Sequence, residues 1–263
     1  MAKKDEFDYV IVGAGSAGCT LASRLTEDPG VSVLVLEAGG WDKDFWLHIP
    51  LAWGRNVLQR RADWMYSSEA EAGTAHRRIA INRGKVIGGS SSINGLAYVR
   101  GHRGDYDRWA ESGLDHWSYA HVLPYFRRQE RWEGGASAYR GGDGPLYTIA
   151  PQSGDPINEA ILEAGARAGF PFTPDYNGAQ QEGFCHSQST IKHGHRCSAA
   201  VAYLHPALER GSDLTVETGA LARRVVFAGT RAVGVEYEQR GEVKLARAAR
   251  EVILAGGAIN SPQ

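Results

Sequence analysis

Three glycines and one glutamate near the N-terminus have the types and spacing that bind a dinucleotide. Gly13, Gly15 and Gly18 form a G-x-G-x-x-G pattern directly after an apolar run, and Glu37 follows about 20 residues later. The first glycine allows a sharp turn, the second lets backbone approach a pyrophosphate, and the third lets a helix lie close on a strand. The carboxylate of Glu37 can accept hydrogen bonds from two ribose hydroxyls, and it repels a 2′-phosphate. The pattern therefore predicts a dinucleotide site.

The elements that must hold these residues are visible in the same stretch. Residues 9–12 and 31–36 are apolar runs typical of strands buried on both faces of a parallel sheet, and residues 16–27 have helical spacing between them. The apolar face of this helix is predicted to contain Ala17, Leu21, Ala22 and Leu25. Strand, glycine turn, helix and strand predict a βαβ unit whose helix N-terminus faces the diphosphate. The alternative, a glycine-rich turn in an unrelated α/β domain, leaves Glu37 without a role.

A second turn rich in small and hydroxyl-bearing residues lies within residues 84–101. Gly88 and Gly89 precede three serines at 90–92, and Asn94 follows them. Such a turn can cradle a phosphate or the polar edge of an aromatic ring system. The other interpretation is a helix start capped by serine or asparagine. The residues alone leave both interpretations open.

Composition indicates an ordinary soluble globular protein. Of 263 residues, 43% are hydrophobic and 22% are charged, and the length is sufficient for a sizeable core. The formal net charge of -1 provides no field that would recruit nucleic acid or an anionic membrane. Three cysteines cannot form a disulfide framework, and we see neither a secretory signal nor a transmembrane segment. We therefore expect a cytoplasmic protein.

The rest of the chain predicts further helices followed by strands. We expect helices over residues 105–111, 119–130, 157–168 and 198–210, and a short strand over 145–149. The third of these helices has Ile157, Ile161, Leu162 and Ala168 on one side, and Gly169 is its predicted stop. From residue 214 the pattern alternates as in a β-meander, with turns at Gly229 and Gly241, and residues 252–255 predict a strand returning to the central parallel sheet. Residues 41–83 have neither helical nor strand periodicity of apolar residues. They predict a long ordered loop, and loops of this kind are usually functional.

With these stretches identified, the chain resembles the glucose–methanol–choline (GMC) oxidoreductases, flavoproteins that oxidise alcohols. GKVIGGSSSINGLAYVRGHRGDYD at 84–107 is similar to the first family signature, and GAINSPQ at 257–263 is similar to the start of the second. GHRCSAAVAYLHP at 194–206 is similar to the family segment G-x-R-x-S…YL-x-P. The resemblance covers essentially the whole chain, and it is closest to the choline dehydrogenase-like branch through GGSSSIN and VRGHRGDYDRW.

The resemblance implies an α/β fold: a Rossmann-like FAD-binding domain with a central parallel sheet and a β-meander, plus an incomplete α+β substrate domain. Residues 1–150 would form the FAD-binding domain, 151–213 part of the substrate or cap region, and 214–263 the meander and the strand returning to the FAD-binding domain. The implied cofactor is FAD. It would be bound non-covalently, because Ile93 stands where some choline-oxidising members carry a flavin-linked histidine.

The resemblance also implies which residues contact FAD. The glycine turn would hold the diphosphate, Glu37 the adenosine ribose, Val225 the adenine, and residues 83–97 the flavin and its ribityl chain. The full implied set is Gly13, Gly15, Ser16, Ala17, Gly18, Glu37, Ala38, Arg83, Gly84, Val86, Gly88, Gly89, Ser90, Asn94, Gly95, Ala97 and Val225.

The implied reaction is oxidation of a primary alcohol, choline-like or another small alcohol, to an aldehyde by hydride transfer to flavin N5. Oxygen or a quinone-type carrier would then accept the electrons. The family's catalytic histidine and its His or Asn partner are expected beyond Gln263, so no catalytic residue is assigned, and we expect the chain to be a fragment.

Three alternatives remain open on sequence grounds. One is a nicotinamide-dependent Rossmann dehydrogenase, which gives residues 84–101 no purpose. Another is a truncated FAD-binding or partner-binding module without catalysis. The third is a zinc site: His193, His195 and Cys197 alternate as on one face of a strand, and Cys185 or His186 could add a ligand. No C-x-x-C pair supports the zinc site, so we predict no metal.

Overall fold

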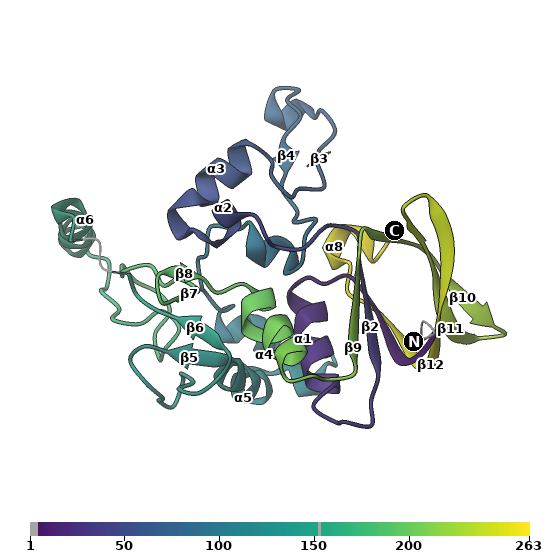
Figure 1. Ribbon diagram of the computed structural model, residues 1–263. Coiled ribbons are helices and arrows are strands. Elements are labelled where there is room, and N and C mark those ends of the chain that lie inside the picture. Colours follow the sequence, from purple (N-terminus) through teal and green to yellow (C-terminus); the bar gives the residue numbers. More distant parts are fainter. Residues whose placement is uncertain (1–4, 152–153) are drawn as a thin grey trace. The chain divides into compact units, whose positions relative to one another are not determined.

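The computed structural model describes residues 5–151 and 154–263, and the chain forms two compact units (Figure 1). The first unit consists of Met1–Gly95 and His195–Gln263, and the second of Leu96–Gly194. These boundaries differ from the predicted domain ends at 150 and 213. Residues 96–150 pack with the segment that follows them, as the hydrogen bonds between Ile149 and Ser189 illustrate.

A six-stranded sheet forms the centre of the first unit, in the order β10-β11-β12-β1-β2-β9. Its strands are β1 (Glu6–Val12), β2 (Val33–Glu37), β9 (Leu214–Thr218), β10 (Ala220–Ala228), β11 (Arg231–Gln239) and β12 (Glu242–Leu254). β12, β1, β2 and β9 run parallel, whereas β10, β11 and β12 form an antiparallel meander. The predicted α/β fold with a parallel sheet and a meander is confirmed.

The strands β9 and β12 differ in how they pair within the sheet. β9 is not part of the meander, because it pairs in parallel with β2 at the opposite edge of the sheet. β12 pairs with β11 through its first half and with β1 through its second half, where Val252 lies opposite Val10. The predicted return of residues 252–255 to the parallel sheet is thus confirmed. So are the predicted turns, since Gly229 and Gly241 have φ of +62° and +80°.

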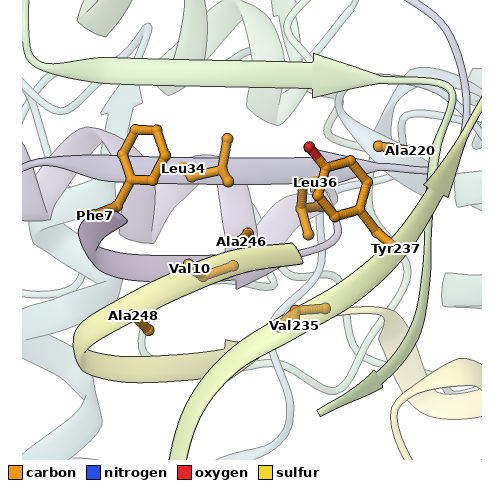
Figure 2. Close-up of a cluster of buried hydrophobic side chains, with 9 residues drawn as sticks. All are labelled: Phe7, Val10, Leu34, Leu36, Ala220, Val235, Tyr237, Ala246 and Ala248. Atoms are coloured by element: carbon orange, nitrogen blue, oxygen red, sulfur yellow. The ribbon is translucent and has the colours of Figure 1, made fainter. Parts of the chain in front are cut away.

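One core cluster unites the parallel sheet and the meander (Figure 2). Its buried members are Phe7, Val10, Leu34, Leu36, Ala220, Val235, Tyr237, Ala246 and Ala248. Burial of a large apolar side chain contributes about 1.5–3 kcal/mol, so this cluster fixes β1 and β2 against the strands that close the sheet.

Helix α1 (Ser16–Leu25) packs on β1 and β2 through small residues. Its buried residues are Gly18, Cys19, Ala22 and Ser23. The predicted face was therefore wrong in part, since Ala17 is exposed and Leu21 and Leu25 are only partly buried. Small residues on the inner face bring the helix axis close to the sheet, which a face rich in leucine would prevent.

The segment predicted as one helix over 198–210 is divided. Ala200–Leu204 is π-helical and α7 (His205–Glu209) is α-helical. Pro206 explains the change, because proline has no N–H to donate to the carbonyl four residues earlier and the backbone hydrogen bonding widens before it.

Residues 41–83 form short elements, as the absence of a sustained period indicated. They are α2 (Phe45–His48), a 3-10 helix (Pro50–Ala52), α3 (Trp53–Leu58), β3 (Tyr66–Ser67), a 3-10 helix (Ala72–Thr74) and β4 (Ala80–Ile81). A further 3-10 helix (Gly89–Ser92), β8 (His195–Arg196) and α8 (Gly257–Asn260) complete the first unit.

The second unit contains smaller elements. They are α4 (Arg103–Glu111), a 3-10 helix (Asp115–Trp117), α5 (Tyr119–Gln129), β5 (Glu130–Trp132), β6 (Leu146–Thr148), α6 (Pro156–Arg167) and β7 (Ile191–Lys192). The apolar side of α6 is largely exposed, because Ile157 and Ile161 are 60% and 51% exposed. α6 is instead buried at Gly165, where an added Cβ would lie 2.7 Å from Cγ of Phe184.

Two sequence-based expectations concern metals and membranes. His193 has φ of +49° and lies in a turn between β7 and β8, so His193, His195 and Cys197 do not alternate along one strand. Over residues 5–151 and 154–263, no group of three His, Cys, Asp or Glu side chains could hold a metal ion. Within the same residues, every helix is too short or too polar to cross a membrane.

Candidate functional site

The glycine turn lies where β1 ends, between the ends of β2 and β12. The N–H of Gly13 donates to the carbonyl of Leu36 over 2.8 Å, and φ of Gly13 is +98°. A Cβ on Gly13 would lie 2.6 Å from the carbonyl oxygen of Ala255, and one on Gly18 would lie 1.9 Å from that of Gly13. Backbone atoms cannot move aside as a side chain can, so both positions require glycine.

The N-terminus of α1 has the properties of an anion site. Gly15 is the N-cap residue and offers no side-chain hydrogen bond to the first turn, and Ser16 and Ala17 are exposed. The first amides of a helix have no acceptor within the helix, and they carry the positive end of its dipole. A diphosphate of a dinucleotide fits this donor set.

Glu37 ends β2 beside the glycine turn and is 5% exposed. Its Oε2 accepts from the N–H of Ala14 over 2.9 Å, and its Oε1 accepts from that of Gly39 over 2.8 Å. Burial raises the pKa of Glu37, although the two amides and the charge of Lys85 oppose the rise. Each carboxylate oxygen has a second acceptor direction, so Glu37 can brace the turn and still accept from a ribose hydroxyl.

The second glycine turn packs directly against the first. The N–H of Gly88 donates to the carbonyl of Ala14 over 2.7 Å. A Cβ on Gly89 would lie 2.7 Å from Cα of Gly15, and one on Gly84 would lie 2.2 Å from the carbonyl oxygen of Gly89. The structure therefore brings together two stretches that are separated by some 70 residues of sequence, at a distance only glycines allow.

The three serine hydroxyls of this turn form hydrogen bonds with backbone groups of residues 84–88. Gly88 precedes the 3-10 helix Gly89–Ser92 and provides no side-chain cap. Ser91 Oγ donates to the carbonyl of Gly88, and Ser92 Oγ donates to that of Ile87. Ser90 Oγ accepts from the N–H of Gly84. The serines thus brace the turn and do not cap a helix start.

The remaining predicted contact residues are less clustered. Val86 is buried and Ala38 is partly buried, whereas Arg83, Asn94 and Gly95 are exposed. Ala97 belongs to the second unit. Val225 lies in β10, which β11 and β12 separate from β1 in the sheet. The convergent part of the predicted set is therefore Gly13, Gly15, Ser16, Ala17, Gly18, Glu37, Ala38, Gly84, Val86, Gly88, Gly89 and Ser90.

Sequence reasoning missed two polar groups beside these turns. Arg196 is 1% exposed, and its Nη1 donates to Asn94 Oδ1 over 2.8 Å. His205 Nε2 lies 3.0 Å from Oδ2 of the buried Asp42, and the hydrogen bond to Asp42 raises the pKa of His205 despite its partial burial. The G-x-R-x-S segment contained the only available signal for Arg196, and no spacing pattern linked Asp42 to His205.

Comparison with known proteins identifies the family. The sequence model of the GMC oxidoreductases matches residues 7–263. The chain is 51% identical to the mitochondrial choline dehydrogenase of Mus musculus, covering 99% of this chain and 45% of that protein. It is 48% identical to the oxygen-dependent choline dehydrogenase of Chromohalobacter salexigens, covering 100% of this chain and 48% of that protein.

Solved structures agree with the sequence comparison. Pyridoxine 4-oxidase from "Mesorbium loti" superposes with a TM-score of 0.90 at 36% identity, covering 97% of this chain and 50% of that one. Formate oxidase of Aspergillus oryzae RIB40 superposes with a TM-score of 0.89 at 27% identity, covering 100% of this chain and 47% of that one. The chain thus spans about half the length of the relatives it matches. On the match over residues 7–263, the chain belongs to the GMC oxidoreductase family.

Proposed function

We propose that this chain is the FAD-binding part of a flavoenzyme that oxidises a small primary alcohol, choline-like or related, to an aldehyde. The observation that carries the proposal is the contact between the two glycine turns, with the uncapped N-terminus of α1 and Glu37 beside them. The names of the relatives, choline dehydrogenases among them, support the class of reaction. A solved relative from Chaetomium thermophilum is itself described as an FAD-dependent oxidoreductase.

Each convergent residue has a proposed task. The N-terminal amides of α1 would hold the diphosphate, and Glu37 would accept hydrogen bonds from the adenosine ribose. The turn at residues 84–90, together with Asn94, would contact the flavin end. When bound, FAD would accept a hydride at N5 from the alcohol carbon, and oxygen or a quinone-type carrier would reoxidise it.

The domain assignment extends this proposal. We infer that the predicted FAD-binding domain, residues 1–150, takes its cofactor contacts from the first compact unit, completed by residues 214–263. Residues 151–213 would contribute to the substrate or cap region. Arg83, Gly95, Ala97 and Val225 are kept as proposed contacts on the family resemblance alone. A cytoplasmic location is proposed because the three cysteines of the chain, Cys19, Cys185 and Cys197, are too few for a disulfide framework.

The proposal is tested by titrating the chain with FAD and following flavin fluorescence. We expect Glu37→Gln to weaken FAD binding about tenfold, since hydrogen bonds to a charged group contribute about 1.5–3 kcal/mol. Glu27→Gln is the matched control, because Glu27 lies just beyond α1, is exposed and forms an ion pair with the exposed Arg24. Equal affinity in Glu37→Gln, or binding of NAD in place of FAD, would refute the proposal.

The mode of attachment gives a second test. Ile93 is 3% exposed and has no nucleophilic atom, so the bound FAD is expected to be non-covalent. Precipitation of the flavin-loaded protein with acid should leave the yellow colour in the supernatant. Colour that stays with the pellet would contradict the prediction.

A further inference from the structure

Arg196 is a buried cation held by three segments of the first unit. Arg196 lies at the end of β8 and is 1% exposed. Its Nε donates to the carbonyl of Leu47 over 2.8 Å. Its Nη1 donates to the carbonyl of Ser91 over 3.1 Å and to Oδ1 of Asn94 over 2.8 Å. One guanidinium thus ties α2, Ser91 and Asn94 to β8.

The charge of Arg196 is not compensated by a carboxylate. Among the described residues no carboxylate acts on the pKa of Arg196, and its buried Nη2 has no hydrogen-bond partner. Burial lowers the pKa of Arg196 to about 10, which still leaves it charged at neutral pH. The other deeply buried arginines, Arg100 and Arg140, both pair with Glu130. An unpaired buried charge is costly, so its presence needs a reason outside the stability of the chain.

The hydrogen bond from Arg196 also fixes the orientation of Asn94. A guanidinium has donors and no acceptor, so Asn94 must turn its oxygen toward Arg196. The amide nitrogen, which is the donor end, then lies on the opposite side of the carboxamide. Asn94 is exposed and directly follows the turn that packs on Gly15. Its donor end is therefore set by a residue that has no exposed surface of its own.

We propose that Arg196 is a positioning residue for the flavin: it orients the amide of Asn94 as a donor, and its uncompensated charge favours reduction of the bound cofactor. The inference rests on the proposed FAD-binding function. Reduced flavin carries more negative charge than oxidised flavin, and a fixed positive charge in a low-dielectric interior stabilises it. The same charge lowers the stability of the flavin-free chain.

The first test compares Arg196→Gln with Arg196→Lys in the flavin-loaded chain. We expect Arg196→Gln to bind FAD roughly tenfold or more weakly and to shift the flavin reduction potential, measured against reference dyes, to a more negative value. Arg196→Lys keeps the charge and loses the fork of donors, so it should restore most of the potential and little of the affinity. Arg223→Gln is the control, because it removes an exposed arginine of the same unit.

A second variant covers the case in which Arg196→Gln does not fold. Asn94→Asp keeps an acceptor for Arg196 and supplies the missing negative charge. We expect it to raise the thermal stability of the flavin-free chain while it weakens FAD binding and makes the reduction potential more negative. No gain in thermal stability would show that the charge of Arg196 is already compensated, and unchanged FAD affinity would show that the donor end of Asn94 does not contact the cofactor; either result would contradict the inference.

The outcomes separate this inference from the function on which it rests. If the unmodified chain binds no FAD, the proposed function fails, and the Asn94 side-chain amide signals in NMR spectra of the flavin-free chain then decide the remaining claim. These signals should move in Arg196→Gln and stay in place in Arg223→Gln. If the unmodified chain binds FAD and Arg196→Gln leaves affinity and potential unchanged, the function stands and the inference is overturned.

Discussion

Asp42 and His205 show how one buried carboxylate and one histidine make folding depend on pH. Asp42 is 5% exposed, and both of its oxygens lie within 3.1 Å of His205 Nε2. The hydrogen bond from His205 and the charges of Asp42 and Glu209 raise the pKa of His205, and burial opposes the rise. The imidazole of His205 also stacks on the ring of Trp41. Protonated His205 is therefore favoured in the folded chain.

The sign of the pH dependence follows from this direction. Because the pKa of His205 is higher in the folded than in the unfolded chain, its contribution is complete below about pH 6.5 and is lost as the pH rises through the folded value. His205→Gln should be less stable than the unmodified chain by about 1 kcal/mol at pH 6, and the difference should shrink toward pH 8.5. Denaturant unfolding at both pH values measures it. His76→Asn at an exposed position is the control, and a gap that is constant with pH would rule out the charged pair.

At the level of elements, the position of α1 is determined by the close contact between its first turn and the glycine turn. A Cβ on Gly18 would meet the carbonyl oxygen of Gly13 at 1.9 Å, so Gly18→Ala must shift the helix or the turn. We expect a loss of roughly 3 kcal/mol in unfolding free energy together with loss of FAD binding. Gly54→Ala in α3 is the matched control, because nothing lies within 4 Å of its Cβ position.

Gly18→Ala and Gly54→Ala together test whether the effect of an added methyl group on stability depends on the space at its Cβ position. Gly54→Ala should leave stability unchanged or raise it by about 0.5–1 kcal/mol, since alanine is the better helix former. Thermal unfolding of the two variants side by side gives the comparison. A Gly18→Ala variant as stable as the unmodified chain would show that α1 does not lie against the turn.

Elements whose signals are local could be predicted from sequence, and those that depend on distant partners could not. The βαβ unit, the turns at Gly229 and Gly241 and the returning strand were predicted because period and turn residues lie within a few positions of each other. Pro206 lies inside the segment predicted as one helix, and its effect on the hydrogen bonding of the preceding turn is seen only in the folded chain. Ile157 and Ile161 have helical spacing, yet spacing cannot say which face meets a partner, and the contact at Gly165 depends on Phe184.

The candidate site divides in the same way. The glycines and Glu37 were predicted because the G-x-G-x-x-G pattern and the acid beyond it are close in sequence. That Gly89 touches Gly15 follows only from the folded chain. The hydrogen bond between Arg196 and Asn94 joins residues 102 positions apart, and no local sequence pattern predicts it.

At the scale of the whole molecule, the two units have different kinds of interior. The first is held by the apolar cluster of its sheet, whereas the second is organised around Glu130, which is 0% exposed. Glu130 accepts hydrogen bonds from Arg100 Nη2, from Nε and Nη2 of Arg140, and from the N–H of Gly141. Thr148 Oγ1 donates to it as well. Glu130 thus pairs with two buried arginines, and Asp175 supplies a second carboxylate to Arg140.

This difference predicts that the units can be destabilised separately. Glu130→Gln leaves Arg100 and Arg140 without their shared charge, and breaking a buried ion pair in this way costs about 3–5 kcal/mol. Amide hydrogen exchange should then lose protection across residues 96–194, while β1, β2 and β12 keep theirs. Glu163→Gln, which removes an exposed ion pair with Arg167, should change neither unit. Loss of protection in β1 and β2 to the same extent as in β5 would mean that the chain unfolds as one cooperative body, and Glu130 would then support the cofactor site as well as its own unit.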